Sequence, residues 1–266
     1  MHEFPLTHGA AMRYLDLPGD GLPVLFIHGL GCAGSADYPE VAASPALQGH
    51  RAIIVDLPGA GFSDRPDGWD CSVTGHALTL ARFVESLGLA RLALYGHSAG
   101  GPVAIELTEA LPDAVAALVI GEGNLDAGGG TISRAIAAAG SVPRMNVATA
   151  TRLPKSVVRA AGGVPSWEAM LRTASPAALL AWASSLVEGG TPSWRDWLYG
   201  LAKRLPVTYL FGALSLPDSD VDELGRHGVR VEVIPDVGHQ MAWQGPDALA
   251  GAIARALSSA SSAIGN

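Results

Sequence analysis

Short apolar segments rich in β-branched residues recur along the chain, and longer stretches with a helical hydrophobic period separate them. Six of the short segments predict buried strands: Val24–Ile27, Ala52–Val55, Leu92–Tyr95, Ala116–Ile120, Val207–Phe211 and Val229–Ile234. They lack the apolar–polar alternation of half-exposed strands, which favours a parallel sheet covered on both faces. Met12–Leu17 predicts an earlier strand at the edge of this sheet.

Helices are predicted between these strands. One face of a helical period carries Val73, Ala77, Leu80, Val84 and Leu87. Pro102–Leu111 and Asp247–Leu257 show similar patterns. Because strands and helices alternate along the chain, the sequence predicts an α/β fold, doubly wound, with a mostly parallel sheet.

One interval departs from this alternation. Residues 125–204 contain no strand candidate, and about eighty residues is far more than a strand–helix–strand crossover needs. We interpret this interval as an inserted helical cap on a core domain formed by residues 1–124 and 205–266. The cap carries nine Arg and Lys against four Asp and Glu, so its net charge is +5 and the remainder is −13, which sums to −8. A solvated basic face and a cap that attracts anionic substrates both fit this excess.

Composition narrows the class of protein. Of the 266 residues, 48% are hydrophobic and 16% are charged, which is typical of a globular chain. The net charge of −8 makes nucleic acid and anionic membrane poor partners. We find neither a signal peptide nor an apolar run of membrane-spanning length, and therefore expect a cytoplasmic protein, monomeric or homodimeric, with reduced Cys32 and Cys71. No metal-ligand cluster is visible, so we expect neither a metal nor a cofactor.

The strongest chemical signal is Gly96-His97-Ser98-Ala99-Gly100. It directly follows the predicted strand Leu92–Tyr95 and precedes a predicted helix, which is the strand–turn–helix setting of a nucleophile elbow. In so tight a turn, a β-carbon two residues to either side of the serine would collide with its neighbours, hence Gly96 and Gly100. The context predicts that Ser98 is a nucleophile rather than an incidental turn residue.

A serine hydroxyl needs a base and a site for the oxyanion. His239 follows the last predicted strand and can reach back across the carboxyl edge of the sheet, where the elbow also lies. The glycine-rich loop His28-Gly29-Leu30-Gly31 follows another strand. It can aim the amide of Leu30 at the oxyanion beside the amide of Ala99.

Together these segments resemble the α/β-hydrolase superfamily. The resemblance rests on His28-Gly29, Asp56-Leu57-Pro58-Gly59-Ala60-Gly61-Phe62-Ser63-Asp64, Gly96-His97-Ser98-Ala99-Gly100 and Gly238-His239, and covers roughly residues 10–122 and 205–258. It implies an α/β-hydrolase sheet with Ser98 as nucleophile, His239 as base, and the amides of Leu30 and Ala99 as oxyanion hole.

The third member of the expected triad departs from the family's usual pattern. Many relatives carry the acid a few residues after strand 7, where this chain has Ser215. The candidates are Glu122, at the end of the predicted strand Ala116–Ile120, or an aspartate among Asp218, Asp220 and Asp222. We favour Glu122, because an unpaired charge is costly at the end of an apolar strand, and hold Asp218 as the runner-up.

A serine nucleophile implies attack on a carbonyl carbon. We therefore expect a serine hydrolase of the carboxylesterase type, cleaving a small-molecule ester, thioester or lactone through an acyl-enzyme. The alternatives are a hydrolase of C–C bonds in anionic diketone-type substrates and a non-catalytic receptor on the same fold. The expected substrate contacts are His28, which also supports its loop, Gly29, His97, Trp167, Trp182 and Trp243.

Overall fold

The fold is known from a computed structural model, which describes residues 1–138 and 165–264. Within these residues, eight strands form one sheet in the order β1-β2-β4-β3-β5-β6-β7-β8. The strands are β1 His2–Pro5, β2 Ala11–Leu17, β3 Gly21–Ile27, β4 His50–Asp56, β5 Leu92–His97, β6 Val115–Gly121, β7 Val207–Gly212 and β8 Arg230–Ile234. Strand β2 pairs antiparallel with β1 and β4, and every other neighbouring pair is parallel.

The predicted doubly wound, mostly parallel sheet is confirmed, and the six predicted buried strands correspond to β3–β8. Two details were wrong. Met12–Leu17 is not at the edge, because β1 pairs along its outer side. At the other edge, β8 is not covered on both faces, since only Ile234 among its residues is buried.

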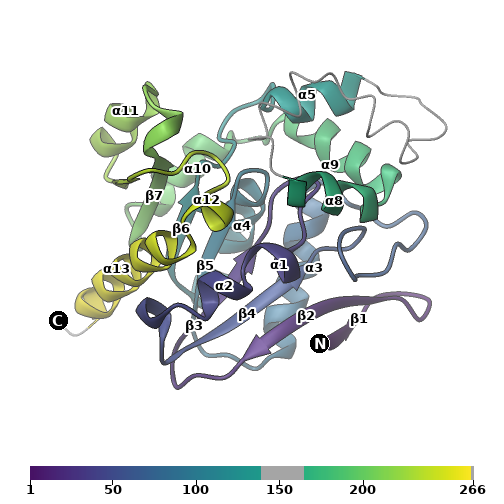
Figure 1. Ribbon diagram of the computed structural model, residues 1–266, viewed down its shortest axis with the longest axis horizontal. Coiled ribbons are helices and arrows are strands. Elements are labelled where there is room, and N and C mark those ends of the chain that lie inside the picture. Colours follow the sequence, from purple (N-terminus) through teal and green to yellow (C-terminus); the bar gives the residue numbers. More distant parts are fainter. Residues whose placement is uncertain (139–164, 265–266) are drawn as a thin grey trace.

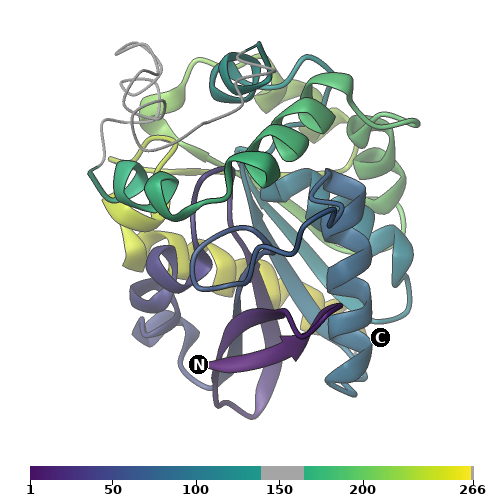
Figure 2. The same cartoon turned by 90° about the vertical axis from the view of Figure 1, so that its right-hand side faces the viewer.

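Helices cover both faces of the sheet (Figures 1 and 2). Against one face pack α3 Val73–Ser86 and α4 Gly100–Ala110. Against the other pack the short elements α1 Gly34–Asp37, α2 Pro39–Ala42 and η1 Pro45–Leu47, together with α13 Pro246–Ile264. Two further short elements, η2 Ala213–Ser215 and α11 Asp220–Arg226, join β7 to β8, and α12 Met241–Gln244 lies between β8 and α13.

The described chain between β6 and β7 contains helices and no strand. These are α5 Thr131–Ala138, α8 Pro165–Thr173, α9 Pro176–Glu188 and α10 Trp194–Leu201. Figure 1 shows α5, α8 and α9 above the carboxyl edge of the sheet. Residues 139–164 of the predicted cap, with four of its nine basic residues, lie outside the described residues. The division into a core domain and a cap therefore stays a prediction.

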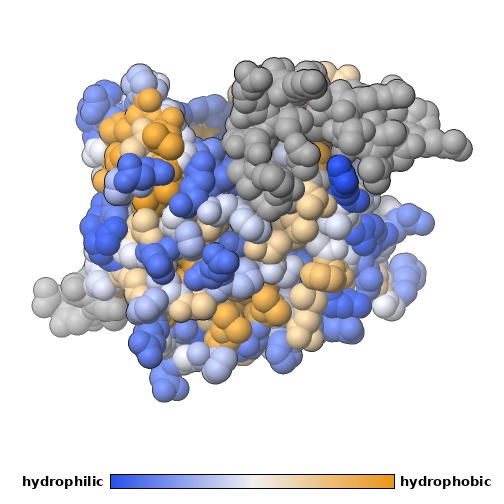
Figure 3. Space-filling model, viewed as in Figure 1, coloured by the Kyte–Doolittle hydropathy of each residue, from blue (hydrophilic) through white to orange (hydrophobic). Residues whose placement is uncertain are grey.

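The face of the molecule seen in Figure 3 is mostly hydrophilic, and hydrophobic residues gather near the corner that carries α11. None of the helices in the described ranges is long and apolar enough to cross a membrane. Cys32 and Cys71 are both buried free thiols.

Candidate active site

Ser98 lies in a strained turn between β5 and α4. Its backbone φ is +53°, in the left-handed region that residues with a side chain rarely adopt. A β-carbon on Gly96 would lie 2.5 Å from the carbonyl oxygen of Gly100, and one on Gly100 would lie 2.6 Å from the carbonyl oxygens of Ile27 and His28. The turn therefore requires both glycines, and it presents the serine hydroxyl at the carboxyl edge of the sheet.

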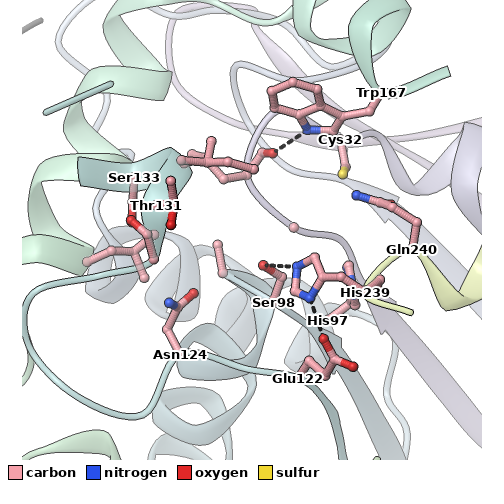
Figure 4. A pocket seen from close by; sticks show the side chains of 16 residues that line it. Cys32, His97, Ser98, Glu122, Asn124, Thr131, Ser133, Trp167, His239 and Gln240 are labelled. Atoms are coloured by element: carbon pink, nitrogen blue, oxygen red, sulfur yellow. Dashed lines mark hydrogen bonds and ion pairs between the residues drawn. The ribbon is translucent and has the colours of Figure 1, made fainter. Parts of the chain in front are cut away.

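The structure brings Ser98, His239 and Glu122 together into one hydrogen-bonded chain, which we call the candidate triad (Figure 4). Nδ1 of His239 lies 2.7 Å from Oε2 of Glu122, and Nε2 lies 3.0 Å from Oγ of Ser98. A carboxylate only accepts hydrogen bonds, so Nδ1 carries the proton and Nε2 presents its lone pair to the serine hydroxyl. This is the tautomer that a general base requires.

Glu122 directly follows β6, and its carboxylate faces the end of β7. Its backbone φ is +43°, a second left-handed residue beside Ser98. The amide of Gly212 donates to Oε1 over 2.8 Å. Burial alone would raise the pKa of Glu122, but the hydrogen bond from His239, the charge of that ring and the hydrogen bonds from Gly212 and Ser215 outweigh it. The pKa is lowered overall, so the carboxylate is ionised at neutral pH.

Asp218, the alternative acid, lies in a different environment. Its side chain is exposed, and Oδ1 accepts the amide of Asp220 over 2.8 Å. Its carboxylate therefore holds the chain at the start of α11, and it is Glu122 that contacts His239.

Two backbone amides that line the pocket are candidates for an oxyanion hole. Leu30 and Ala99 both line the pocket in front of the serine. Ala99 immediately precedes α4, whose N-terminus adds partial positive charge. Neither amide has a hydrogen-bond acceptor among the described residues. Both remain open to a substrate oxygen.

His97 lines the same pocket and is in contact with His239. Its Nε2–H donates to the backbone carbonyl of His239 over 2.7 Å, and the two rings are 4.8 Å apart. Burial and, second, the neighbouring His239 ring lower the pKa of His97 to about 3. His97 is therefore neutral across the working pH range of most enzymes.

A cavity of about 290 Å³ lies above the candidate triad. Its walls combine the carboxyl edge of the sheet with Ile132 and Ser133 of α5, Trp167 of α8 and Leu186 of α9. In Figure 4, polar side chains on the α5 side face Trp167 and Cys32 across the opening. The indole of Trp167 donates to the carbonyl of Leu30 over 3.1 Å, which joins α8 to the loop that carries the Leu30 amide.

Of the expected substrate contacts, Gly29, His97 and Trp167 line this cavity, whereas three others do not. His28 is fully buried, donates through Nδ1 to the carbonyl of Gly29 and accepts the amide of Leu57, so it supports its loop. Trp182 is buried against the ring of His76, 4.6 Å between centroids. Trp243 is 42% exposed and donates to Asp37.

Sequence reasoning missed several polar residues of the cavity, namely Cys32, Asn124, Thr131, Ser133 and Gln240. Asn124 and Gln240 are close in sequence to Glu122 and His239, and this proximity could have indicated that they line the cavity. Thr131 and Ser133 begin a helix of the predicted cap, where no motif marks them. Within the described ranges, no group of three or more His, Cys, Asp or Glu side chains could hold a metal ion.

Comparison with known proteins identifies the fold. A family model for the alpha/beta hydrolase fold matches residues 23–146, slightly under half of the chain, which include most of β3, all of β4 to β6 and the elbow. The structure of a thermophilic esterase from Thermogutta terrifontis superposes with a TM-score of 0.78 at 24% identity, covering 98% of this chain and 99% of that one. The chain therefore has the alpha/beta-hydrolase fold.

Other proteins resemble the chain in sequence or in structure. A 2-hydroxy-6-oxo-2,4-heptadienoate hydrolase from Pseudomonas putida is 34% identical over 103 residues, which are 38% of this chain and 37% of that protein. The alignment thus spans well under half of this curated relative. The N-acyl homoserine lactonase AidH, in complex with N-hexanoyl homoserine, has a TM-score of 0.77 at 22% identity, covering 96% of this chain and 94% of that one.

Proposed function

We propose that this chain is a serine hydrolase of the α/β-hydrolase fold that cleaves a carboxylic ester, thioester or lactone through an acyl-enzyme. The observation that carries the proposal is the continuous hydrogen-bonded chain from Ser98 through His239 to Glu122 at the base of a cavity. A structural turn would explain the glycines of the elbow. It would not explain a serine hydroxyl aligned with the basic nitrogen of a correctly oriented histidine.

The proposed reaction follows from this geometry. Nε2 of His239 takes the proton of Ser98 as its Oγ bonds to the substrate carbonyl carbon, and the amides of Leu30 and Ala99 hold the oxyanion. Glu122 stabilises the imidazolium that forms. His239 then protonates the leaving oxygen or sulfur, and afterwards activates a water that releases the acid and restores Ser98.

The cavity supports a neutral substrate. Asn124, Ser133 and Gln240 offer neutral hydrogen-bonding groups, and Trp167 and Leu186 offer apolar surface. The described lining residues include no Arg or Lys, so a substrate carboxylate would find no cationic partner among them. Neutral esters and lactones are therefore our first choice. The alternative of C–C bond cleavage in an anionic diketone-type substrate stays open because the Pseudomonas putida relative is named for a related compound.

The deciding experiment is covalent labelling by a fluorophosphonate, followed by intact-mass measurement. We expect one adduct on the wild-type protein and none on Ser98→Ala, with both proteins folded by circular dichroism. A folded wild-type protein that takes up no label would refute the serine-hydrolase proposal and favour a receptor. A rate comparison between short neutral p-nitrophenyl esters, lactones and an anionic dienone then separates the substrate classes.

The remaining expectations stay predictions. They are a cytoplasmic location, a monomer or homodimer, the absence of nucleic-acid and membrane partners, and a reaction without cofactor.

A further inference from the structure

The loop that carries His239 is held in place from the opposite side of the active site. His239 lies between β8 and α12, outside any helix or strand. Among the described residues, its backbone carbonyl accepts one hydrogen bond, from the ring of His97, and its backbone amide donates none. Flanking residues are fixed by other contacts: the amide of Gly238 donates to Oε1 of Gln244, and the carbonyl of Val237 accepts the amide of Leu214.

The donor of that hydrogen bond is itself rigid. His97 is the last residue of β5 and pairs in register with Gly121 of β6, so its backbone belongs to the centre of the sheet. Its side chain is only 6% exposed. A hydrogen bond that spans 142 positions of sequence thus ties the loop that carries His239 to a central strand of the sheet.

The same ring also borders the loop that carries an oxyanion amide. A β-carbon on Gly29 would lie 3.3 Å from Nδ1 of His97 and 3.2 Å from Cβ of Ser98. The segments that carry the nucleophile, the base and the Leu30 amide therefore meet at one imidazole. We infer that His97 is a positioning residue whose Nε2–H holds the backbone of His239 so that its ring lines up between Ser98 and Glu122.

Histidine suits this place for two reasons. Its Nε2 extends far enough from the backbone to donate to the carbonyl of His239. It also stays uncharged, which matters because His239 becomes an imidazolium during the proposed reaction and a second cation 4.8 Å away would oppose it.

Substituting His97 by glutamine or by asparagine distinguishes the effect of losing the hydrogen bond from the effect of altered packing. In His97→Gln, the terminal amide nitrogen lies near the position of Nε2 and can still donate to the His239 carbonyl. In His97→Asn, the amide nitrogen lies near Nδ1 and cannot reach it. His76→Phe is the matched control for loss of a buried histidine, since His76 lies on α3 with neither ring nitrogen bonded among the described residues.

This inference rests on the proposed function, so the test measures the rate of fluorophosphonate labelling of Ser98, with melting temperature recorded for each variant. We expect labelling by His97→Asn to slow by about 10- to 100-fold, the usual effect of misplacing a reacting group by about 1 Å, with His97→Gln within about threefold of wild type. His76→Phe should label at the wild-type rate. If His97→Asn does not fold, His97→Leu takes its place.

The outcomes are distinguishable. A wild-type protein that is not labelled refutes the proposed function and this inference with it. A labelled wild type together with an equally fast His97→Asn overturns this inference alone. So does a folded His97→Gln that is as slow as His97→Asn.

Discussion

Replacing Glu122 by glutamine removes the negative charge beside His239 while keeping the shape of the side chain. It therefore tests whether the candidate triad needs that charge. Oε1 of Glu122 accepts the Gly212 amide, and Oε2 accepts Nδ1–H of His239. A glutamine has one oxygen and one NH₂ group for these two donors. As long as Nδ1 of His239 keeps its proton, one N–H group faces another whichever way the glutamine turns.

If the glutamine oxygen stays on Gly212, its NH₂ group donates to Nδ1 of His239. The imidazole must then carry its proton on Nε2, where it cannot accept the proton of Ser98. The ion pair is lost as well. At a charge separation of about 4 Å and an effective dielectric constant of about 20, the attraction between imidazolium and carboxylate is about 4 kcal/mol, or roughly three factors of ten in rate. Together we expect kcat to fall by about 10³- to 10⁴-fold.

The assay is steady-state hydrolysis of a p-nitrophenyl ester, with Asp218→Asn as the matched control. Asp218 is exposed, and an asparagine can still accept the amide of Asp220. Its kcat should therefore stay within about twofold of wild type, as for most surface substitutions. A larger loss in Asp218→Asn than in Glu122→Gln would refute our assignment of the acid.

Two further predictions concern stability. Gly96→Ala should lower the free energy of unfolding by about 1–3 kcal/mol, because the new β-carbon would lie 2.5 Å from the carbonyl oxygen of Gly100. Gly200→Ala has open space around its β-carbon and should raise the free energy of unfolding by about 0.5–1 kcal/mol. Urea titration measures both, and equal effects of the two substitutions would contradict the argument. Burial raises the pKa of Asp37 to about 6, so the folded state binds its proton more tightly than the unfolded chain does, and this contribution to stability falls as pH rises from about 4 to about 6. Asp37→Asn, which still accepts the Trp243 indole, should therefore gain about 2–3 kcal/mol over wild type at pH 8 compared with pH 4, and a gain independent of pH would show that the carboxyl is not perturbed.

Much of the sheet could be predicted from the sequence because its central strands are buried on both faces. β3 to β7 are continuous apolar runs, which sliding windows detect. β1 escaped prediction because it has four residues, of which only Phe4 is buried, and it ends in a proline. Its place beside β2 depends on tertiary pairing that no local pattern reveals.

Some residues of the candidate site could also be predicted from the sequence, and others could not. The elbow could be predicted because a tight turn demands glycines at fixed offsets from Ser98. The tryptophans could not be assigned, because an apolar side chain looks the same in sequence whether it lines a cavity, as Trp167 does, or fills a core, as Trp182 does. Polar pocket residues of α5 depend on how that helix lies over the sheet, which is a property of packing.

The proposed acid after β6 changes what the end of β7 contributes. β7 and the following η2 supply donors to the Glu122 carboxylate, through the Gly212 amide and the Ser215 hydroxyl. A β-carbon on Gly212 would lie 2.5 Å from the carbonyl oxygen of Val237, so the two loops approach too closely for a side chain there. Ser98 and Glu122 thus directly follow β5 and β6, His239 lies in the loop after β8, and Gly212 at the end of β7 holds the carboxylate. Since Ser98 and Glu122 both adopt left-handed φ angles at neighbouring strand ends, the surrounding sheet must supply the order of 1–3 kcal/mol that each such residue costs.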